Sequence, residues 1–193
     1  MKTEKLEFDN GVLWIVDNAV PYTQRTSFYN NALLADYQYT LRSSPFPENA
    51  DSLQWTSYLQ DDPNQLHFWA SIVDYLPEEL QTRARSRGLG QCNLNSLFPT
   101  SKCRVHTDGP TMDTDFLIYY INPMWDITWG GETLFLDDTG TTLQYCSQYI
   151  PGRIIFGTGN IPHIVRPPLL TATQPRWALT LRFNDDRKYN NIR

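Results

Sequence analysis

The feature that most constrains this chain is a succession of short apolar runs that begins near residue 90. Glycine, proline, asparagine or aspartate separates each run from the next, and each run has the length of a β-strand. Aromatic residues, which favour strands, make up 13% of the chain. The runs are QCNLNSLF, DTDFLIYYIN, GGETLFL, TTLQYC, GRIIFGTGN, HIVRP and RWALTLRFN. This part of the chain is therefore predicted to form β-sheet.

The part before residue 90 mixes helical and strand patterns. The run VLWIV lies between the turn signals DNG and DN and predicts a first strand. Residues 21–37 begin with a proline and carry apolar residues near helical spacing, which predicts a helix. Residues 64–86 carry apolar side chains three or four positions apart and predict a longer helix. Residues 41–63 are polar and hold three prolines, so we expect an irregular connection with room for one short strand.

These patterns predict an α+β fold in a single domain. A chain of 193 residues is long enough to bury one sizeable core. Helices followed by about seven short strands favour a double-layered barrel, the double-stranded β-helix or jelly roll, with the helices packed on one face of a sheet. In this interpretation residues 1–89 supply supporting strand and helices, residues 90–184 form the jelly-roll core, and residues 185–193 are a polar tail.

Charge and apolar content argue against several classes of partner. The 16 basic and 21 acidic side chains give a net charge of −5, which does not attract nucleic acid and disfavours an acidic substrate. No apolar run approaches the roughly 18 residues of a membrane span, and the charged start has no apolar signal segment. We therefore expect a soluble, cytoplasmic protein. The three cysteines have no CxxC spacing and are expected to be free and mostly buried thiols.

Two of the three histidines lie in the segments RVHTDG and GNIPHIVRP. Residues two apart in a strand point to the same side, so His106 and Asp108 can face a common point. His163, which begins a later strand, is the candidate third ligand. Two neutral imidazoles and one carboxylate on one face leave coordination positions open, an arrangement that suits Fe(II) in oxygenases.

The same residues have a structural interpretation. An HxD triplet occurs by chance, and a histidine in a folded protein is commonly hydrogen-bonded to its surroundings without binding a metal. His67, on the predicted long helix, is assigned no role. The position of the second ligand element on a later strand of a β-rich region favours the metal hypothesis.

A family resemblance extends over about residues 90–184. The blocks RVHTDG, DFLIYYINPMWDITWGGETLFL, PGRIIFGTGNIPHIVRP and RWALTLRF occur in this order. Together they resemble the catalytic core of the iron(II)- and 2-oxoglutarate-dependent dioxygenases of the prolyl-4-hydroxylase type. The resemblance implies a jelly roll with iron held by His106, Asp108 and His163. It also implies that 2-oxoglutarate is decarboxylated to succinate and CO2 while O2 oxidises a C–H bond of a substrate.

Such enzymes use a cation at the start of the last strand to bind the far carboxylate of 2-oxoglutarate. Arg176 occupies that place, and a guanidinium can bind a carboxylate through two hydrogen bonds. The insert PPLLTATQP lengthens the interval between His163 and Arg176, so the register of the arginine is open. Arg182, of the same strand parity, and Arg166, near His163, are the alternatives.

The resemblance also suggests further contacts to the cosubstrate. Tyr120 is placed where similar enzymes direct a tyrosine hydroxyl at the same carboxylate, whereas Tyr119 should face the other layer. Asn95 is expected to contact 2-oxoglutarate or substrate, and Thr180 shares the strand face of Arg176. The GGE segment is interpreted as serving the fold, and Arg153 as a structural ion-pair partner.

The substrate class stays open at this level. The resemblance is compatible with a prolyl or other peptidyl substrate and with a small molecule, and the segments SSPFPENADS and PMWDITW are candidate lids. The main alternative function is a non-redox jelly-roll module of cupin type that binds a metal or a sugar. That alternative accounts for the fold and the histidines, but not for an inward-facing arginine at the head of the last strand.

Overall fold

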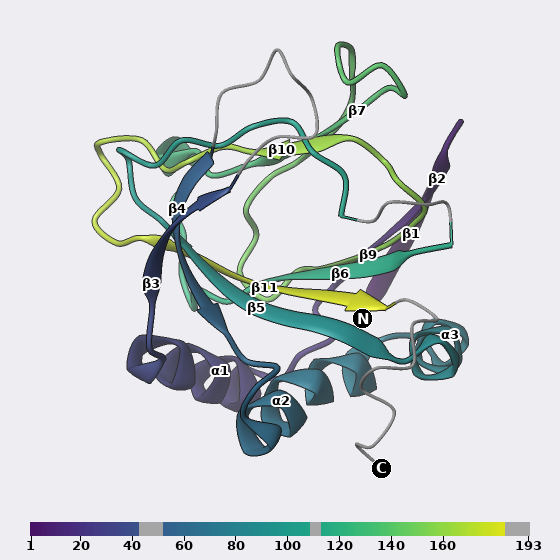
Figure 1. Ribbon diagram of the computed structural model, residues 1–193, viewed down its shortest axis with the longest axis horizontal. Helices are drawn as coiled ribbons and strands as arrows, with labels where there is room; N and C mark the ends of the chain where they lie inside the picture. The colour runs from purple at the N-terminus through teal and green to yellow at the C-terminus, as the bar shows by residue number, and fades with distance from the viewer. Residues whose placement is uncertain (43–51, 109–112, 184–193) are drawn as a thin grey trace.

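The computed structural model describes residues 1–42, 52–108 and 113–183 (Figure 1). The polar tail and nearly all of the candidate lid SSPFPENADS lie outside these residues. The described chain forms two antiparallel sheets and a layer of helices. Figure 1 shows the helices together on one side of the larger sheet, with the smaller sheet on the other side.

The larger sheet has eight strands, and its spatial order differs from the order in the chain. From one edge to the other the strands are β1 (Lys2–Phe8), β2 (Gly11–Asp17), β9 (Ile154–Thr158), β6 (Asp115–Tyr120), β11 (Arg176–Phe183), β5 (Leu89–Leu97), β4 (Ser52–Tyr58) and β3 (Gln38–Arg42). The C-terminal strand β11 therefore lies in the centre, between β6 and β5. Alternate residues of β11, from Arg176 to Arg182, form one wall of the space between the two sheets.

The smaller sheet has three strands, in the order β10 (His163–Val165), β7 (Thr133–Leu136) and β8 (Leu143–Ser147). It faces the larger sheet and closes a double layer, so the predicted jelly roll is confirmed. The chain reaches this sheet through the short 3-10 helix η2 (Ile127–Trp129), which lies in the candidate lid PMWDITW.

The helical layer consists of α1 (Tyr22–Leu34), α2 (Pro63–Ala70), the 3-10 helix η1 (Ser71–Tyr75) and α3 (Glu78–Arg87). The prediction of one helix over residues 64–86 is thus wrong. Pro77 has no backbone N–H and its ring restricts the preceding residue, so Leu76 is extended and the helix is interrupted there. The apolar spacing persists across the break because both segments pack on the same sheet.

Two cores follow from strand alternation. Residues on one face of the large sheet pack against the helices, as Tyr119 does against Phe28 of α1. Residues on the other face, including Tyr120 and Phe116, pack between the two sheets. Because successive side chains point to opposite faces, Tyr119 and Tyr120 belong to different cores, as the sequence predicts.

The N-terminal region contributes strands to the large sheet as well as helices. β1, which was not anticipated because it is rich in charge, pairs with β2 as a hairpin, and β2 pairs in turn with β9. Arg153, just before β9, forms a two-bond ion pair with Asp17 at the end of β2. This partly buried pair ties the hairpin to the core strands, in agreement with the structural role expected for Arg153.

Two sequence expectations concern the wider molecule. Cys92, Cys103 and Cys146 are all free, but only Cys92 is fully buried and Cys146 is exposed. Among the helices of residues 1–42, 52–108 and 113–183, none is both long and apolar enough to cross a membrane.

Candidate active site

His106, Asp108 and His163 lie together between the two sheets. Their candidate ligand atoms are all within 4.8 Å of one another. The Nε2 atoms of His163 and His106 are 3.4 Å and 4.0 Å from the Asp108 carboxylate. Backbone pairing brings the ligand segments together, because His106 and His163 exchange hydrogen bonds through their N–H and C=O groups at 2.9 Å and 2.8 Å.

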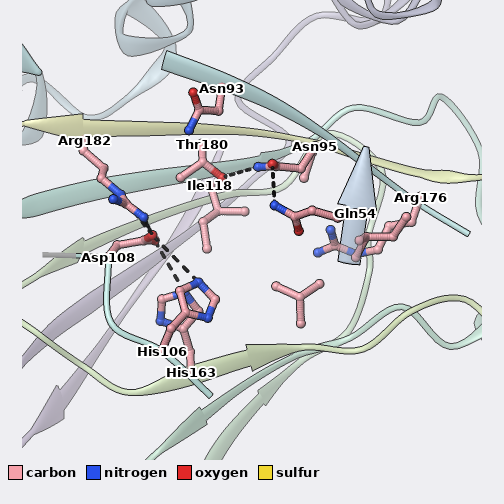
Figure 2. Close-up of a pocket in the computed structure, with 13 residues that line it drawn as sticks. Gln54, Asn93, Asn95, His106, Asp108, Ile118, His163, Arg176, Thr180 and Arg182 are labelled. Carbon is pink, nitrogen blue, oxygen red and sulfur yellow. Dashed lines mark hydrogen bonds and ion pairs between the residues drawn. The ribbon is translucent and has the colours of Figure 1, made fainter. Parts of the chain in front are cut away.

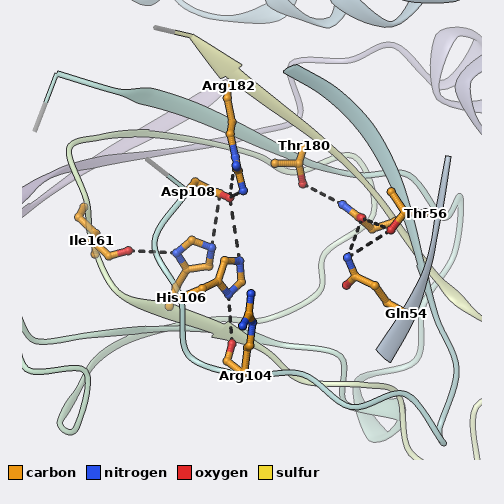
Figure 3. Close-up of polar contacts among 10 residues, drawn as sticks. Gln54, Thr56, Arg104, His106, Asp108, Ile161, Thr180 and Arg182 are labelled. Atoms are coloured by element: carbon orange, nitrogen blue, oxygen red, sulfur yellow. Dashed lines mark hydrogen bonds and ion pairs between the residues drawn. The ribbon is translucent and has the colours of Figure 1, made fainter. Parts of the chain in front are cut away.

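The ring orientation of both histidines is set by backbone carbonyls (Figure 3). His106 Nδ1 lies 3.1 Å from the carbonyl oxygen of Arg104, and His163 Nδ1 lies 3.0 Å from that of Ile161. A carbonyl oxygen only accepts hydrogen bonds, so each Nδ1 carries a hydrogen, and in the neutral ring the lone pair is on Nε2. Outer hydrogen bonds of this type orient imidazoles that bind metals.

Electrostatics keep these ligands in the forms that a metal requires. Burial, reinforced by the nearby His163, lowers the pKa of His106 to about 3, so its ring is neutral at pH 7. Burial alone would raise the pKa of Asp108, but the Arg182 guanidinium and His163 hold it well below its ordinary value. A neutral imidazole and an ionised carboxylate bind a cation without first losing a proton.

Arg182 contacts Asp108 directly. Its Nε and Nη2 donate to the same carboxylate oxygen, Oδ1, at 3.2 Å and 2.8 Å. The other oxygen, Oδ2, is the one that lies 3.4 Å from His163 Nε2. The arginine therefore orients the carboxylate with Oδ2 toward His163, while Oδ1 lies 4.0 Å from His106 Nε2.

Aromatic rings pack around His163. Phe116 of β6 stacks on the imidazole at a centroid distance of 5.6 Å, and Phe135 of β7 lies 5.5 Å away. Phe116 in turn lies over Gly157 of β9, where any side chain would collide with the phenyl ring. Glycine is thus required at this position by close approach, and the aromatic layer fixes the ring of His163, a candidate metal ligand.

Arg176 lies at the opposite end of the pocket from Arg182 (Figure 2). It is 1% exposed, and its guanidinium carbon is 5.0 Å from the ring centres of both Tyr120 and Tyr149. Nε donates to the Gly131 carbonyl at 2.8 Å and Nη2 to Thr133 Oγ1 at 3.2 Å. Within the described residues no carboxylate lies within ion-pair distance of this buried cation.

The GGET segment therefore does more than shape the fold. Gly131 and Thr133 hold the Arg176 side chain, and Gly131 adopts a left-handed φ of +85° that favours glycine. Sequence reasoning missed Thr133. The position of GGET between the two ligand segments was the one sequence signal for a role of Thr133. Strand parity shows which residues of β11 share a face, but it does not reveal that Arg176 contacts Thr133 on another strand.

The Tyr120 hydroxyl is not brought into the pocket. Tyr120 is fully buried, and its hydroxyl donates to Thr133 Oγ1 at 2.8 Å and lies 3.3 Å from Ser147. The ring supports the Arg176 guanidinium from one side instead. Tyr120 thus packs against Arg176 on the side away from the pocket, because Thr133 of the GGET segment accepts the hydrogen bond of its hydroxyl.

Asn95 and Thr180 do line the pocket and are hydrogen-bonded to each other at 3.2 Å. Asn95 Oδ1 also accepts from Gln54 at 3.1 Å and from Thr56 at 3.2 Å, both on β4 (Figure 3). Asn93 lines the pocket as well. Gln54 was missed because it belongs to the polar stretch that was expected to be irregular. Arg166 is exposed and borders a separate surface hollow, so it does not substitute for Arg176.

Comparisons with known proteins agree on the fold. No protein-family model matches the sequence, and the search of curated proteins found no match. Solved structures do match. A Pseudomonas putida prolyl-4-hydroxylase is 14% identical, with a TM-score of 0.62 over 91% of this chain and 93% of that chain.

Two further structures match over similar lengths. A Trichoplax adhaerens prolyl hydroxylase in complex with a hypoxia inducible factor peptide is 17% identical, with a TM-score of 0.62 over 93% of this chain and 86% of that one. HygX from Streptomyces hygroscopicus, with nickel, 2-oxoglutarate and hygromycin B bound, is 12% identical, with a TM-score of 0.61 over 93% and 85%. The chain described here therefore has the jelly-roll fold found in 2-oxoglutarate-dependent oxygenases, including prolyl hydroxylases.

Proposed function

We propose that this protein is an Fe(II)- and 2-oxoglutarate-dependent dioxygenase that hydroxylates a C–H bond and releases succinate and CO2. The observation that carries the proposal is the buried Arg176 guanidinium, which has no carboxylate partner among the described residues and shares a pocket with the His–Asp–His cluster. Burial of an unpaired charge is costly, so a site that retains one is built to receive an anion.

The donor set of the cluster fits iron. Two imidazole Nε2 atoms and one carboxylate oxygen converge from one side, which leaves positions for other ligands. Bound Fe(II) and 2-oxoglutarate would supply oxidative decarboxylation coupled to C–H oxidation by O2. His106, Asp108 and His163 would hold the metal, and Arg176 would bind the far carboxylate of the cosubstrate.

The remaining residues orient and enclose these groups. Gly131 and Thr133 fix the guanidinium of Arg176, and the rings of Tyr120 and Tyr149 lie against it. Asn95 and Thr180 form a polar wall beside the space between Arg176 and the cluster (Figure 2). They are positioned to hydrogen-bond the cosubstrate or the substrate. The double layer of sheets restricts access of water to this space.

The non-redox alternative accounts for less of the site. A metal- or sugar-binding module would explain the cluster, but it would leave the Arg176 cation buried without a counter-charge. A prolyl or peptidyl substrate is supported by the Trichoplax structure, which contains a peptide, and a small-molecule substrate by HygX, which contains hygromycin B.

The proposal is tested by two measurements on the purified protein. Under nitrogen, Fe(II) and 2-oxoglutarate together should produce a weak visible charge-transfer band, and admission of O2 should produce succinate. Asp108→Ala should lose both signals and bind Fe(II) more weakly while its circular dichroism spectrum is retained. Absence of the band in the wild-type protein at saturating Fe(II) and 2-oxoglutarate would reject the proposal.

A further inference from the structure

Arg182 is a second cation in the pocket, and the far carboxylate of 2-oxoglutarate does not need it. It lies six residues after Arg176 on β11, and both side chains point to the same face of the strand. Figure 2 shows Arg182 beside His106, Asp108 and His163, and Arg176 on the far side of the pocket. A cosubstrate that extends from Arg176 to the three candidate ligands would not occupy Arg182, which lies at the other end of the pocket.

Most of the hydrogen-bonding capacity of Arg182 is unused. A guanidinium side chain has five N–H donors. Two of them, on Nε and Nη2, are directed at Asp108 Oδ1, and the other three have no hydrogen-bond partner among the residues that the structure describes. The side chain lines the pocket and is 27% exposed, so the described residues do not enclose it.

The charges of the pocket point to an anion at this place. Among the described lining residues, Arg176 and Arg182 are cationic, Asp108 is anionic, and the two histidines are neutral as metal ligands. A divalent metal and the dianion of 2-oxoglutarate cancel each other. The two arginines and Asp108 then leave one net positive charge in the pocket. We place it at the Arg182 end, because the far carboxylate of 2-oxoglutarate would neutralise Arg176. The net charge of −5 is a property of the whole chain and does not offset this local excess.

Asn93 supplies a second, independent observation. It is 1% exposed and lines the pocket, and its Oδ1 has no hydrogen-bond partner within residues 1–42, 52–108 and 113–183. Asn93 pairs with Thr180 on β11, which places it diagonally next to Arg182 on the same face of the sheet. A buried acceptor without a partner is costly unless a ligand provides a donor.

We propose that Arg182 binds a carboxylate of the substrate that is oxidised, and that Asn93 accepts a hydrogen bond from an N–H or O–H group of the same molecule. The inference rests on the proposed function and specifies its substrate class. A carboxylic acid with a nearby donor, such as an α-amino acid, meets both requirements. A prolyl residue inside a peptide meets neither, because it has no free carboxylate and no N–H.

The test measures binding under nitrogen to the purified protein saturated with Fe(II) and 2-oxoglutarate. The probes are the common L-amino acids and short dicarboxylic acids, each paired with its primary carboxamide, and affinity is measured by calorimetry. We expect at least one acid to bind about tenfold to a hundredfold more tightly than its carboxamide. Arg182→Gln should abolish that difference and Arg182→Lys should retain part of it, while Arg166→Gln, which changes an exposed arginine outside the pocket, should retain all of it.

The controls separate this inference from the proposed function. The charge-transfer band reports cosubstrate binding, so a normal band with no preference for any acid over its carboxamide would overturn only the substrate assignment. A large loss of 2-oxoglutarate affinity in Arg182→Gln, with Fe(II) affinity unchanged, would also overturn it, because Arg182 would then belong to the cosubstrate site. Peptides with a free or an amidated C-terminus, and with an internal aspartate, distinguish a free acid from a peptide as the source of the carboxylate.

Discussion

Replacement of Arg176 by glutamine tests directly whether this side chain binds the far carboxylate of 2-oxoglutarate. The wild-type guanidinium is buried, is fixed by Gly131 and Thr133, and can offer a carboxylate two parallel charge-assisted hydrogen bonds. Glutamine is shorter and neutral, so the carboxylate of 2-oxoglutarate would be buried with a single weak donor. The loss of one partner from a buried, hydrogen-bonded charge pair costs about 2–5 kcal/mol.

That cost converts to a large and measurable change. At about 1.4 kcal/mol per factor of ten, the dissociation constant of 2-oxoglutarate should rise about 30-fold to about 4,000-fold. The assay is an anaerobic titration of the Fe(II) protein with 2-oxoglutarate, followed by its charge-transfer band. Affinity for Fe(II) alone should change little, because Arg176 lies across the pocket from the three ligands (Figure 2). Arg176→Lys should fall between wild type and glutamine, since it keeps the charge but not the planar fork.

Matched arginine variants make the outcome decisive. Arg166→Gln is the surface control, and Arg182→Gln tests the other arginine of the same strand face. Both should bind 2-oxoglutarate within a few-fold of wild type when Fe(II) is saturating. If Arg182→Gln carried the large loss while Arg176→Gln stayed near wild type, the assignment of the two ends of the pocket would be reversed.

Three further predictions follow from packing and charge. Gly157→Ala forces its methyl group into the Phe116 ring, so it should lower the free energy of unfolding by about 1–3 kcal/mol and weaken Fe(II) binding, as measured by urea denaturation and metal titration. Asp17→Ala leaves the Arg153 guanidinium without its ion-pair partner and should lower the free energy of unfolding by about 3 kcal/mol in urea denaturation, with an unaltered Fe(II) affinity. An unchanged urea midpoint would contradict a structural role for the pair. The pKa of His106 is lowered to about 3 in the folded protein, so as the pH falls the unfolded chain protonates this histidine before the folded protein does. The metal-free protein should therefore lose about 2 kcal/mol of unfolding free energy between pH 7.5 and pH 5. A His106→Gln variant should lack this part of the pH dependence.

The fold was accessible from the sequence because local patterns agree with it. Alternating and continuous apolar runs separated by turn residues indicated the strands from β5 to β11, and parity assigned Tyr119 and Tyr120 to opposite faces. The hairpin strand β1 was not recognised because its outward side chains are charged and its partner supplies most of the apolar surface. The helix break at Pro77 was overlooked because apolar spacing continues through it.

The candidate site was accessible only in part. The segment around His106 and the resemblance to known oxygenases indicated the cluster, and strand parity placed Arg176 and Arg182 on one face. The hydrogen bond from Arg182 to Asp108 joins a residue of β11 to one in the connection between β5 and β6, and no local pattern encodes it. No local pattern encodes the hydrogen bond from Gln54 to Asn95 either, because Gln54 lies in a polar segment that the sequence predicts to be irregular.

The order of strands in the large sheet has a consequence for how the protein folds. β2 near the N-terminus pairs with β9, so Leu13 and Gly157 must meet across most of the chain, and β11 enters the sheet between two strands that precede it. Such nonlocal pairing requires long loops to close, and the entropic cost of closure comes before the stabilising contacts form. Refolding should therefore take milliseconds to seconds or longer. Because the site joins His106 to His163 and Asp108 to Arg182 across long loops, we expect it to form late in folding, so added Fe(II) should slow unfolding without accelerating folding.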